Sequence, residues 1–483
     1  MAIRLKYLLL IAALGALFLP LIQLLSPFSK VKDLDGDFDI SNKPHFSKEA
    51  FKDGSYQDQL EAHLKDSIGF HNFFIRCNNQ LKYSLFGEIN SSGVVEGKDG
   101  MLIPKSYIES YLGQDFVGED VLQNFSEKLK AVQDSLKAHQ KQFVVLLVPG
   151  KASIYPEKIP DEFLTNRNEK TNYDVFIKLL KEKQINHLNL RNFLEEKKGK
   201  LESQLFANKS VHWSGNTVSV VADTMVNYLR DKFNYEMPYI VREAGEYTVE
   251  NYRYTDYDIA ASMNLLFHIA EDTLYYPNLK FYRSSKVSKP TLLGCGDSFF
   301  QSFKGFYPIL DSSFSQASRL YYYNRFVDWP HRFYDMELFN NMLDIKLELE
   351  RSDLIVVEMT DENIKKLGYG FIDDILAHYN HSNTYDWSRI NQLKADPKNQ
   401  AKASRFHQLA GYSYDQMLTA IAKGKLDKNI LPPSEFEKQV QQKMQEIRNT
   451  PEWLDKVKKQ AIEKNIPLEQ NIRENAEWII NNS

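Results

Sequence analysis

From about residue 120 onward, the chain alternates between amphipathic helical patterns and short, largely apolar runs. The helical patterns cover residues 120–139, 170–183 and 215–232, and the apolar runs cover residues 143–148, 185–190, 291–295 and 353–358. Strands that are apolar on both faces are buried on both faces, which is typical of a parallel sheet covered by helices on each side. The pattern therefore predicts an α/β fold, a three-layer sandwich around a central parallel sheet.

A serine stands where one of these runs ends. Gly296-Asp297-Ser298-Phe299 follows residues 291–295 directly and precedes a Phe-rich segment, so we expect a strand, a tight turn and a helix with Ser298 at the turn. Functional side chains of such sheets gather at the carboxyl ends of the strands. Pro149–Ser153 and Glu358–Thr360 also fall at the C-termini of predicted strands, and we expect them near Ser298.

A candidate base for this serine lies 86 residues earlier in the chain. A serine hydroxyl is a weak nucleophile until a base lies within hydrogen-bond reach. His212, in Ser210-Val211-His212-Trp213, is the candidate base, and backbone N–H groups at the turn, that of Ser298 among them, are candidate oxyanion donors. Taken separately, Gly-Asp-Ser is a common turn and a His beside a Trp is usually a packing residue. It is their combination that indicates a catalytic site.

The N-terminal segment Tyr7–Leu25 is apolar apart from Pro20 and Gln23. A helix of this length spans about 28 Å, close to the thickness of a hydrocarbon core. The segment is either a cleaved signal peptide or a retained anchor. Because no small-residue cleavage site follows it, we expect residues 1–29 to be a transmembrane signal anchor. Arg4 and Lys6 precede it, which predicts a cytoplasmic N-terminus and a main domain across the membrane.

Two further regions lie before residue 120, where the alternation of helices and strands begins. Residues 30–93 predict a polar juxtamembrane linker followed by one or two amphipathic helices that pack on the domain after them. Residues 94–103 predict a hairpin that turns at Lys98-Asp99-Gly100. We expect the α/β domain to occupy residues 94–375.

Residues 376–483 differ from the rest of the chain. They are polar, and from Pro433 they are charged and helical in pattern, with helix starts near Pro451 and Pro467. We expect a C-terminal helical appendage without a catalytic role.

Composition excludes several classes of function. The formal net charge is -4 and no segment forms a basic stripe, which argues against a nucleic-acid partner. The only cysteines are Cys77 and Cys295, and neither has a His or acidic neighbour at metal-ligand spacing. The sequence therefore predicts two free thiols, no metal site and no bound cofactor.

Several segments together resemble one family, the AlgX/AlgJ-type alginate O-acetyltransferases, whose catalytic domain is an SGNH-hydrolase-like α/β fold. In this family, as here, the histidine motif precedes the serine motif, the reverse of their order in ordinary SGNH hydrolases. The resemblance covers roughly residues 50 to 370. It rests on the ordered set Gly54-Ser55-Tyr56-Gln57, Ile68-Gly69-Phe70, Gly97-Lys98-Asp99-Gly100, residues 148–156, His212-Trp213, Asp258-Ile259-Ala260, Gly296-Asp297-Ser298-Phe299 and residues 351–358.

The resemblance implies transfer of an acetyl group to a hydroxyl of a cell-envelope or exported polysaccharide. Ser298 would carry the acetyl group as an ester and His212 would act as the base. Because no coenzyme A signature is visible, the family also implies a membrane-bound O-acyltransferase as the acetyl donor. The protein would be a single-pass inner-membrane protein with its main domain in the periplasm.

Four further residues are expected to contact the substrate. Lys151 and Tyr155 follow a predicted strand, Asp297 neighbours the nucleophile, and Trp213 follows the base. We expect them to line the acceptor cleft.

The chain departs from the family in two places. Ser210 stands where the family has the Asp that orients and charges the histidine, and Tyr257 stands where the family usually has Gly. Either Asp258 or, as second choice, Asp256 replaces the missing acid, or the site works as a Ser-His dyad, or it is inactive. Two other functions therefore stay open: a carbohydrate esterase with the same serine and histidine, and a non-catalytic polysaccharide-binding or scaffold protein of an envelope export complex.

Overall fold

The computed structural model describes residues 43–269, 272–283, 288–330, 345–380, 387–410 and 412–430 without a break. It also describes residues 7, 15, 18–26, 28–36 and 41, and short stretches between residues 443 and 476. Contacts divide the chain into two units, one of residues 82–426 and one of residues 1–81 and 427–483. The larger unit holds the candidate site.

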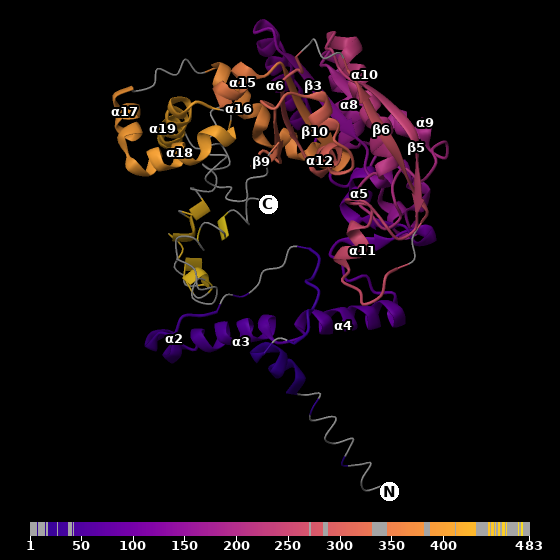
Figure 1. Ribbon diagram of the computed structural model, residues 1–483, viewed down its shortest axis with the longest axis vertical. Coiled ribbons are helices and arrows are strands. Elements are labelled where there is room, and N and C mark those ends of the chain that lie inside the picture. Colours follow the sequence, from indigo (N-terminus) through magenta and orange to yellow (C-terminus); the bar gives the residue numbers. More distant parts are fainter. Residues whose placement is uncertain are drawn as a thin grey trace. The chain divides into compact units, whose positions relative to one another are not determined.

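A six-stranded sheet forms the centre of the larger unit (Figure 1). Its strand order is β4-β3-β10-β7-β8-β9, and all neighbouring strands are parallel except β8 and β9. The strands are β3 (Gln142–Val148), β4 (His187–Asn189), β7 (Leu292–Gly296), β8 (Arg319–Tyr322), β9 (Phe326–Trp329) and β10 (Leu354–Thr360). The predicted α/β fold with a mostly parallel central sheet is confirmed. Strand β8 and the antiparallel edge strand β9 were not predicted.

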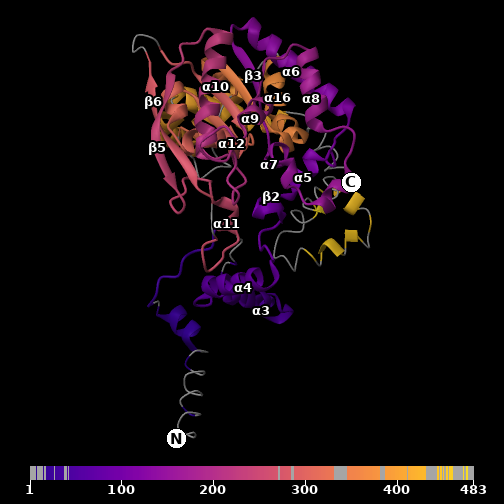
Figure 2. The same cartoon turned by 90° about the vertical axis from the view of Figure 1, so that its right-hand side faces the viewer.

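Helices cover both faces of this sheet (Figure 2). Alternate residues of β3 and β10 point to opposite sides: Val144 and Val356 join one core cluster, and Val145 and Val357 join the other. The first cluster is covered by α9 (Leu190–Lys197), α10 (Gly215–Phe233) and α12 (Ser298–Gly305), and the second by α6 (Glu119–Ala138), α8 (Asn172–Glu182) and α16 (Phe371–Asn380). The continuous apolar strands are thus explained by burial on both faces.

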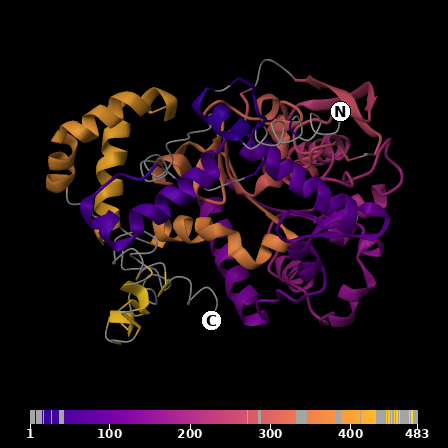
Figure 3. The same ribbon diagram turned by 90° about the horizontal axis from the view of Figure 1, so that it is seen from below.

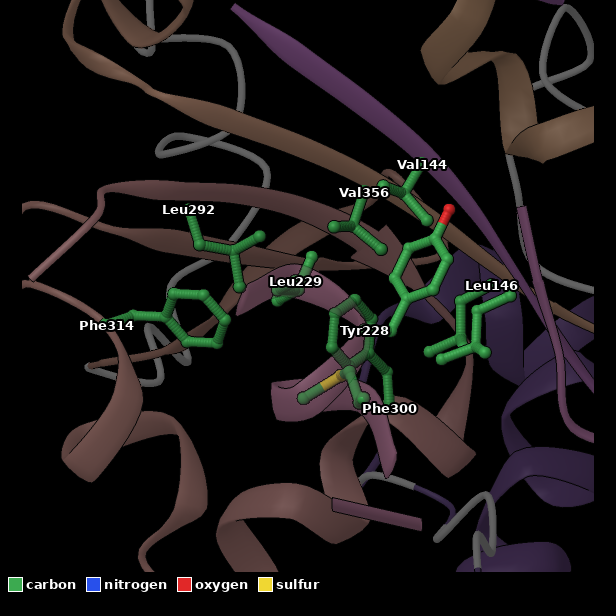
Figure 4. A pocket seen from close by; sticks show the side chains of 10 residues that line it. Val144, Leu146, Tyr228, Leu229, Leu292, Phe300, Phe314 and Val356 are labelled. Carbon is green, nitrogen blue, oxygen red and sulfur yellow. The ribbon is translucent and has the colours of Figure 1, made fainter. Parts of the chain in front are cut away.

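The first cluster contains a small apolar cavity between the sheet and α10 (Figure 4). The labelled side chains converge on it from β3, β7, β10, α10 and α12. The residues that line it are Val144, Leu146, Leu188, Met225, Tyr228, Leu229, Leu292, Phe300, Phe314 and Val356. Because this lining is almost wholly hydrocarbon, the cavity offers nothing that would orient a sugar.

Two small antiparallel sheets flank the central one. The predicted hairpin is confirmed as β1 (Val94–Glu96) and β2 (Leu102–Pro104). The second sheet pairs β5 (Tyr239–Thr248) with β6 (Leu274–Tyr282) and was not predicted, because charged and polar residues interrupt both strands. The loop between β5 and β6 carries the short helix α11 (Asp258–Ser262), which supplies a residue of the candidate site.

The connections of the larger unit are short helices. Between β2 and β4 lie α5 (Lys105–Tyr111), α7 (Lys151–Ile154) and the 3-10 turns η2 (Pro156–Lys158) and η3 (Asp161–Asn166). η1 (Lys98–Gly100) forms the hairpin turn. Further along the chain are α13 (Ile309–Ser313), α15 (Ile345–Arg351) and η4 (Asp361–Gly370).

The helices after residue 380 include three that lie together at one side of the larger unit (Figure 1, Figure 3). They are α17 (Trp387–Ala395), α18 (Pro397–Ala410) and α19 (Tyr414–Ile430). Met417 and Ile421 belong to the same core cluster as Phe371, and the hydroxyl of Tyr412 donates to the buried carboxylate of Glu348 over 2.8 Å. The contact division after residue 426 therefore differs from the boundary predicted at 375/376. The helix starts predicted near Pro451 and Pro467 lie outside the described residues.

The smaller unit begins with helices α2 (Lys48–Asp53), α3 (Ser55–Ser67) and α4 (His71–Phe86), the last of which crosses the division at residue 81. These match the amphipathic helices predicted within residues 30–93. No helix in the described part of the chain combines the length and apolar character needed to cross a bilayer. Most of the anchor predicted over residues 1–29 lies outside the described residues.

Candidate active site

Ser298 is the first residue of α12 and directly follows the turn after β7. Asp297 caps the helix: its carboxylate accepts a hydrogen bond from the Phe299 amide over 2.9 Å. A Cβ on Gly296 would lie 2.5 Å from a carboxyl oxygen of Glu358 and 2.8 Å from the ring of Phe300. Glycine at this position therefore lets the strand pass close to its neighbours and turn sharply, with the serine at the tip of the turn.

The imidazole of His212 lies beside this serine. Its Nε2 is 2.7 Å from Ser298 Oγ. The ring packs against Phe299, with the ring centroids 4.8 Å apart, and His212 is 8% exposed. Two motifs separated by 86 residues are thus brought into direct contact, as the sequence predicted.

Asp258 occupies the other side of the imidazole. Its Oδ2 is 2.6 Å from His212 Nδ1. Its Oδ1 accepts hydrogen bonds from the amides of Val211 over 2.8 Å and Ile259 over 2.7 Å. Because the carboxylate holds both the histidine ring and the histidine loop, the acid is fixed relative to the base.

Ser210, at the family's Asp position, contacts the backbone of the histidine loop. Its hydroxyl donates to the Thr255 carbonyl over 2.8 Å and accepts from the His212 amide over 2.9 Å. The side chain is fully buried. Ser210 therefore ties the histidine loop to the loop that carries Asp258, and the carboxylate beside the imidazole comes from that second loop.

Asp256, the second choice for the acid, lies deeper in the fold. Its Oδ2 accepts hydrogen bonds from the Gly215 amide over 3.1 Å and from the Tyr276 hydroxyl over 2.7 Å. Burial, with the charge of Asp258 as a lesser cause, raises the pKa of Asp256 to about 7. The expectation that Asp256 is the alternative acid is not supported, because its hydrogen bonds go to Gly215 and Tyr276.

The order Ser298–His212–Asp258 has a clear chemical consequence. A carboxylate at Nδ1 favours the tautomer that carries a proton there, which leaves the Nε2 lone pair directed at the serine hydroxyl. When Nε2 takes the serine proton, the Asp258 charge stabilises the resulting imidazolium. The arrangement can therefore generate a serine nucleophile at neutral pH.

The start of α12 can supply donors to an oxyanion. The first N–H groups of a helix have no partner within the helix, and the helix dipole adds partial positive charge there. Asp297 uses the Phe299 amide, while Ser298 is the first helical residue. The Ser298 amide is therefore the donor that the fold offers next to the nucleophile.

A buried carboxyl pair, Asp297 and Glu358, supports the turn from behind. Glu358, at the end of β10, accepts a hydrogen bond from the Asp297 amide over 2.8 Å. Burial, and then the charge of Asp297, raises the pKa of Glu358 well above its ordinary value. Asp297 Oδ2 in turn accepts hydrogen bonds from the Thr360 hydroxyl over 2.9 Å and Asn363 Nδ2 over 2.6 Å. The sequence placed Glu358 at the end of a predicted strand near Ser298 but gave no sign of this role.

The expectation that Lys151 lines the cleft is wrong, because the side chain is fully buried. Its ammonium group donates to four backbone carbonyls at 2.7 to 3.0 Å, those of Leu102, Ala207, Asn208 and Ser210. Lys151 thus fixes the start of the histidine loop to β2. A lysine after a strand gave no sign of this role.

The other predicted substrate contacts are also interior residues. Trp213 is fully buried and meets Phe299 and Phe303 edge to face, at centroid distances of 5.2 and 5.8 Å. The hydroxyl of Tyr155 accepts from the Leu205 amide over 3.1 Å, and Asp297 is 1% exposed. The expectation that they contact the substrate is not supported, because these side chains pack and hydrogen-bond inside the fold.

Comparisons with known proteins agree with the sequence resemblance. Residues 94–256 match the family model described as SGNH hydrolase-like domain, acetyltransferase AlgX. The matched range includes His212 and ends before Asp258 and Ser298. A search of curated protein sequences gave no match.

Three solved structures are similar at low identity. The O-acetyltransferase domain of Pseudomonas putida AlgJ is 18% identical, with 56% of this chain and 92% of that chain covered and a TM-score of 0.37. Pseudomonas aeruginosa AlgX is 13% identical over 61% of this chain and 71% of its own, with a TM-score of 0.40. Bacillus cereus PatB1 with a sulfonyl adduct is 10% identical over 53% of this chain and 93% of its own, with a TM-score of 0.34.

Residues 94–256, which hold His212, are thus similar to the AlgX family of SGNH hydrolase-like acetyltransferase domains.

Proposed function

We propose that this protein transfers an acetyl group, through an ester on Ser298, to a hydroxyl of a cell-envelope or exported polysaccharide of the alginate type. The observation that carries the proposal is the continuous hydrogen-bonded chain from Ser298 Oγ through His212 to Asp258, at 2.7 and 2.6 Å. The family's own acid position holds Ser210, and a complete triad geometry exists nevertheless. A decayed site would have no reason to keep this alignment.

In the first half of the reaction, Ser298 Oγ attacks the carbonyl carbon of the acetyl donor while its proton passes to His212 Nε2. The negative charge that develops on the carbonyl oxygen is stabilised by N–H donors such as that of Ser298. His212 then returns the proton to the leaving group as the bond to the donor breaks. The product of this half is an acetyl ester on Ser298.

In the second half, His212 takes a proton from the acceptor hydroxyl, whose oxygen attacks the acetyl carbon. The bond to Ser298 Oγ breaks, and the same proton returns to Ser298. If water attacks in place of the sugar, the same residues perform ester hydrolysis. Transfer therefore requires that the acceptor outcompete water for this position.

The same proposal includes a donor and a location. A membrane-bound O-acyltransferase would supply the acetyl group, and the N-terminal apolar segment Tyr7–Leu25 would hold the domain beside it at the inner membrane, with the α/β domain in the periplasm. These parts rest on the sequence and on the family resemblance.

The test uses the full-length protein in detergent with an activated acetyl ester, with and without oligosaccharide acceptors. Mass spectrometry should find one added acetyl group on the peptide that contains Ser298, and none in Ser298→Ala. Acetylated oligosaccharide supports transfer, whereas free acetate alone favours an esterase. Absence of acetylation at Ser298 with every donor, together with unchanged polymer acetylation in cells that carry Ser298→Ala, would leave the scaffold role.

A further inference from the structure

Helix α4 is amphipathic, but its buried side chains are polar and its large apolar side chains are exposed, the reverse of a helix that packs on a protein core. Its buried residues are Arg76 and Asn79. Its large apolar side chains are exposed: Phe73 by 42%, Phe74 by 49%, Leu81 by 58% and Leu85 by 65%. Residues 73, 77, 81 and 85 follow one another along one side of a helix, and Phe74 lies next to them. We call these residues, with Cys77, the α4 apolar stripe.

The neighbouring helix α3 shows the same inversion. None of its residues is buried, and Leu64 and Ile68, near its end, are 48% and 43% exposed. α4 follows α3 after a break at residues 68–70. Exposed apolar stretches of this extent mark a surface that has a partner.

The junction between α3 and α4 contacts the end of the N-terminal apolar segment. A Cβ on Gly69 would lie 2.1 Å from the Pro20 carbonyl oxygen and 2.7 Å from Gln23 Cβ, so this approach of the two backbones requires glycine. The rings of Phe28 and Phe70 also meet edge to face at 5.8 Å. The stripe therefore begins at the point where the apolar segment ends.

The charges of this region do not favour an electrostatic partner. Residues 48–86 contain five Lys or Arg side chains and five Asp or Glu side chains. The α4 apolar stripe itself contains no charged residue. Its partner must therefore be recognised by burial of hydrocarbon rather than by charge.

We propose that the α4 apolar stripe lies in the interface of a lipid bilayer, with α4 parallel to the membrane plane. An apolar segment of 19 residues is long enough for a hydrocarbon core of about 30 Å, and the stripe is held at its end. Interfacial helices bury Phe and Leu at the level of the headgroups and keep their polar face away from the lipid. α4 is thus a second membrane contact, which fixes how the smaller unit lies on the bilayer.

The chain carries its own probe for this proposal. Cys77 lies within the stripe and is partly exposed, whereas Cys295, the other cysteine, is buried. A nitroxide spin label on Cys77 therefore reports on the stripe in the unmutated full-length protein. The control is the double variant Cys77→Ser/Lys65→Cys, because Lys65 lies on the charged side of α3 and its side chain is 71% exposed.

The spin relaxation rate of the label is measured in phosphatidylcholine nanodiscs with two reagents. Oxygen enters lipid, whereas a nickel chelate stays in water. At Cys77 we expect the oxygen effect to exceed the nickel effect, and at Lys65→Cys the reverse. The result should be unchanged with anionic lipid or added salt, because the stripe is uncharged.

A nickel effect that exceeds the oxygen effect at Cys77 would place the stripe in water and overturn the proposal. Weak effects of both reagents would assign the stripe to a protein contact, and failure of the chain to enter nanodiscs would also count against it. None of these outcomes depends on acetyl transfer.

Discussion

His212 and Asp258 are 46 residues apart in sequence and 2.6 Å apart at Nδ1 and Oδ2. The acid of this triad is therefore supplied by the loop between β5 and β6, while Ser210, two residues before the histidine, bonds to the backbone. Moving the carboxylate to another loop preserves the charge beside the imidazole, which is what the base needs.

The first prediction compares two neighbouring carboxylates. Asp258→Asn removes the charge and presents the wrong partner to Nδ1, so we expect kcat to fall by about 10³ to 10⁴-fold with little change in KM. Asp256→Asn is the matched control, two residues away and without a hydrogen bond to the ring, and should keep kcat within about threefold of the unmutated protein. Equal losses in both variants would mean that the loop as a whole, and not the charge of Asp258, supports catalysis.

The second prediction concerns Ser210. Ser210→Ala removes the bonds to the Thr255 carbonyl and the His212 amide, and leaves buried backbone groups unpaired. We expect a loss of about 1 to 3 kcal/mol in the free energy of unfolding, measured by urea denaturation. At temperatures where the variant is folded, kcat should fall far less than in Asp258→Asn. A loss as large as that of Asp258→Asn would show that Ser210 acts on the imidazole.

The sequence predicted the central sheet well because its strands are buried on both faces. Residues 143–148 and 353–358 form almost continuous apolar runs, and their predicted bounds lie within one or two residues of those of β3 and β10. β5 and β6 were missed because each carries exposed charged residues, so neither gives a continuous apolar run. β8 and β9 were also missed, because each has four residues and is too short for a periodic signal.

The candidate site was predictable only in part. Ser298 and His212 stand in recognisable motifs, and Asp258 was the first choice for the acid because the family motif marks its position. The roles of Lys151, Trp213 and Glu358 were not predictable, because burial decides them. A lysine that holds four carbonyls and a surface lysine look the same in a sequence.

The third prediction follows from the raised pKa of Asp256. Burial raises this pKa to about 7, from about 3.9 in an unfolded chain, so the folded state binds the proton more tightly. The contribution of Asp256 to the free energy of unfolding is greatest below its pKa in the unfolded chain. This contribution falls by about 4 kcal/mol in all as the pH rises toward 7. Asp256→Asn keeps an oxygen for Gly215 and Tyr276 without the charge. We expect its Tm to exceed that of the unmutated protein at pH 8 and the difference to vanish near pH 4.

The measurement is a thermal unfolding series between pH 4 and pH 8. Tyr276→Phe serves as the companion variant, since it removes a donor to Asp256 and should steepen the loss of stability with pH. A constant difference between Asp256→Asn and the unmutated protein across this range would mean that folding does not raise the pKa of Asp256.

The fourth prediction concerns the buried ammonium of Lys151. Lys151→Met fills a similar volume but leaves the carbonyls of Leu102, Ala207, Asn208 and Ser210 without this donor. We expect a loss of about 3 to 5 kcal/mol in the free energy of unfolding, because four buried carbonyls lose a charged donor. Lys209→Met is the control, because the Lys209 ammonium donates to the carbonyl of Gly100 and its loss should cost about 1 kcal/mol. Similar losses in the two variants would contradict a network role for Lys151.

The last prediction tests whether the neutral form of Glu358 supports the nucleophile turn. Burial raises the pKa of Glu358 well above its ordinary value, which favours the uncharged side chain as the acceptor for the Asp297 amide. Glu358→Gln keeps that acceptor, so we expect stability within about 1 kcal/mol of the unmutated protein. Glu358→Ala leaves the Asp297 amide unpaired and opens a gap beside Gly296, at a cost of about 2 to 5 kcal/mol. The decisive measurement is the rate of Ser298 acetylation at pH 7 in the glutamine variant. We expect a rate close to that of the unmutated protein, because the turn needs a hydrogen-bond acceptor at this position and no charge. A loss as large as that of Asp258→Asn would mean that the proton of Glu358 is itself used in the reaction.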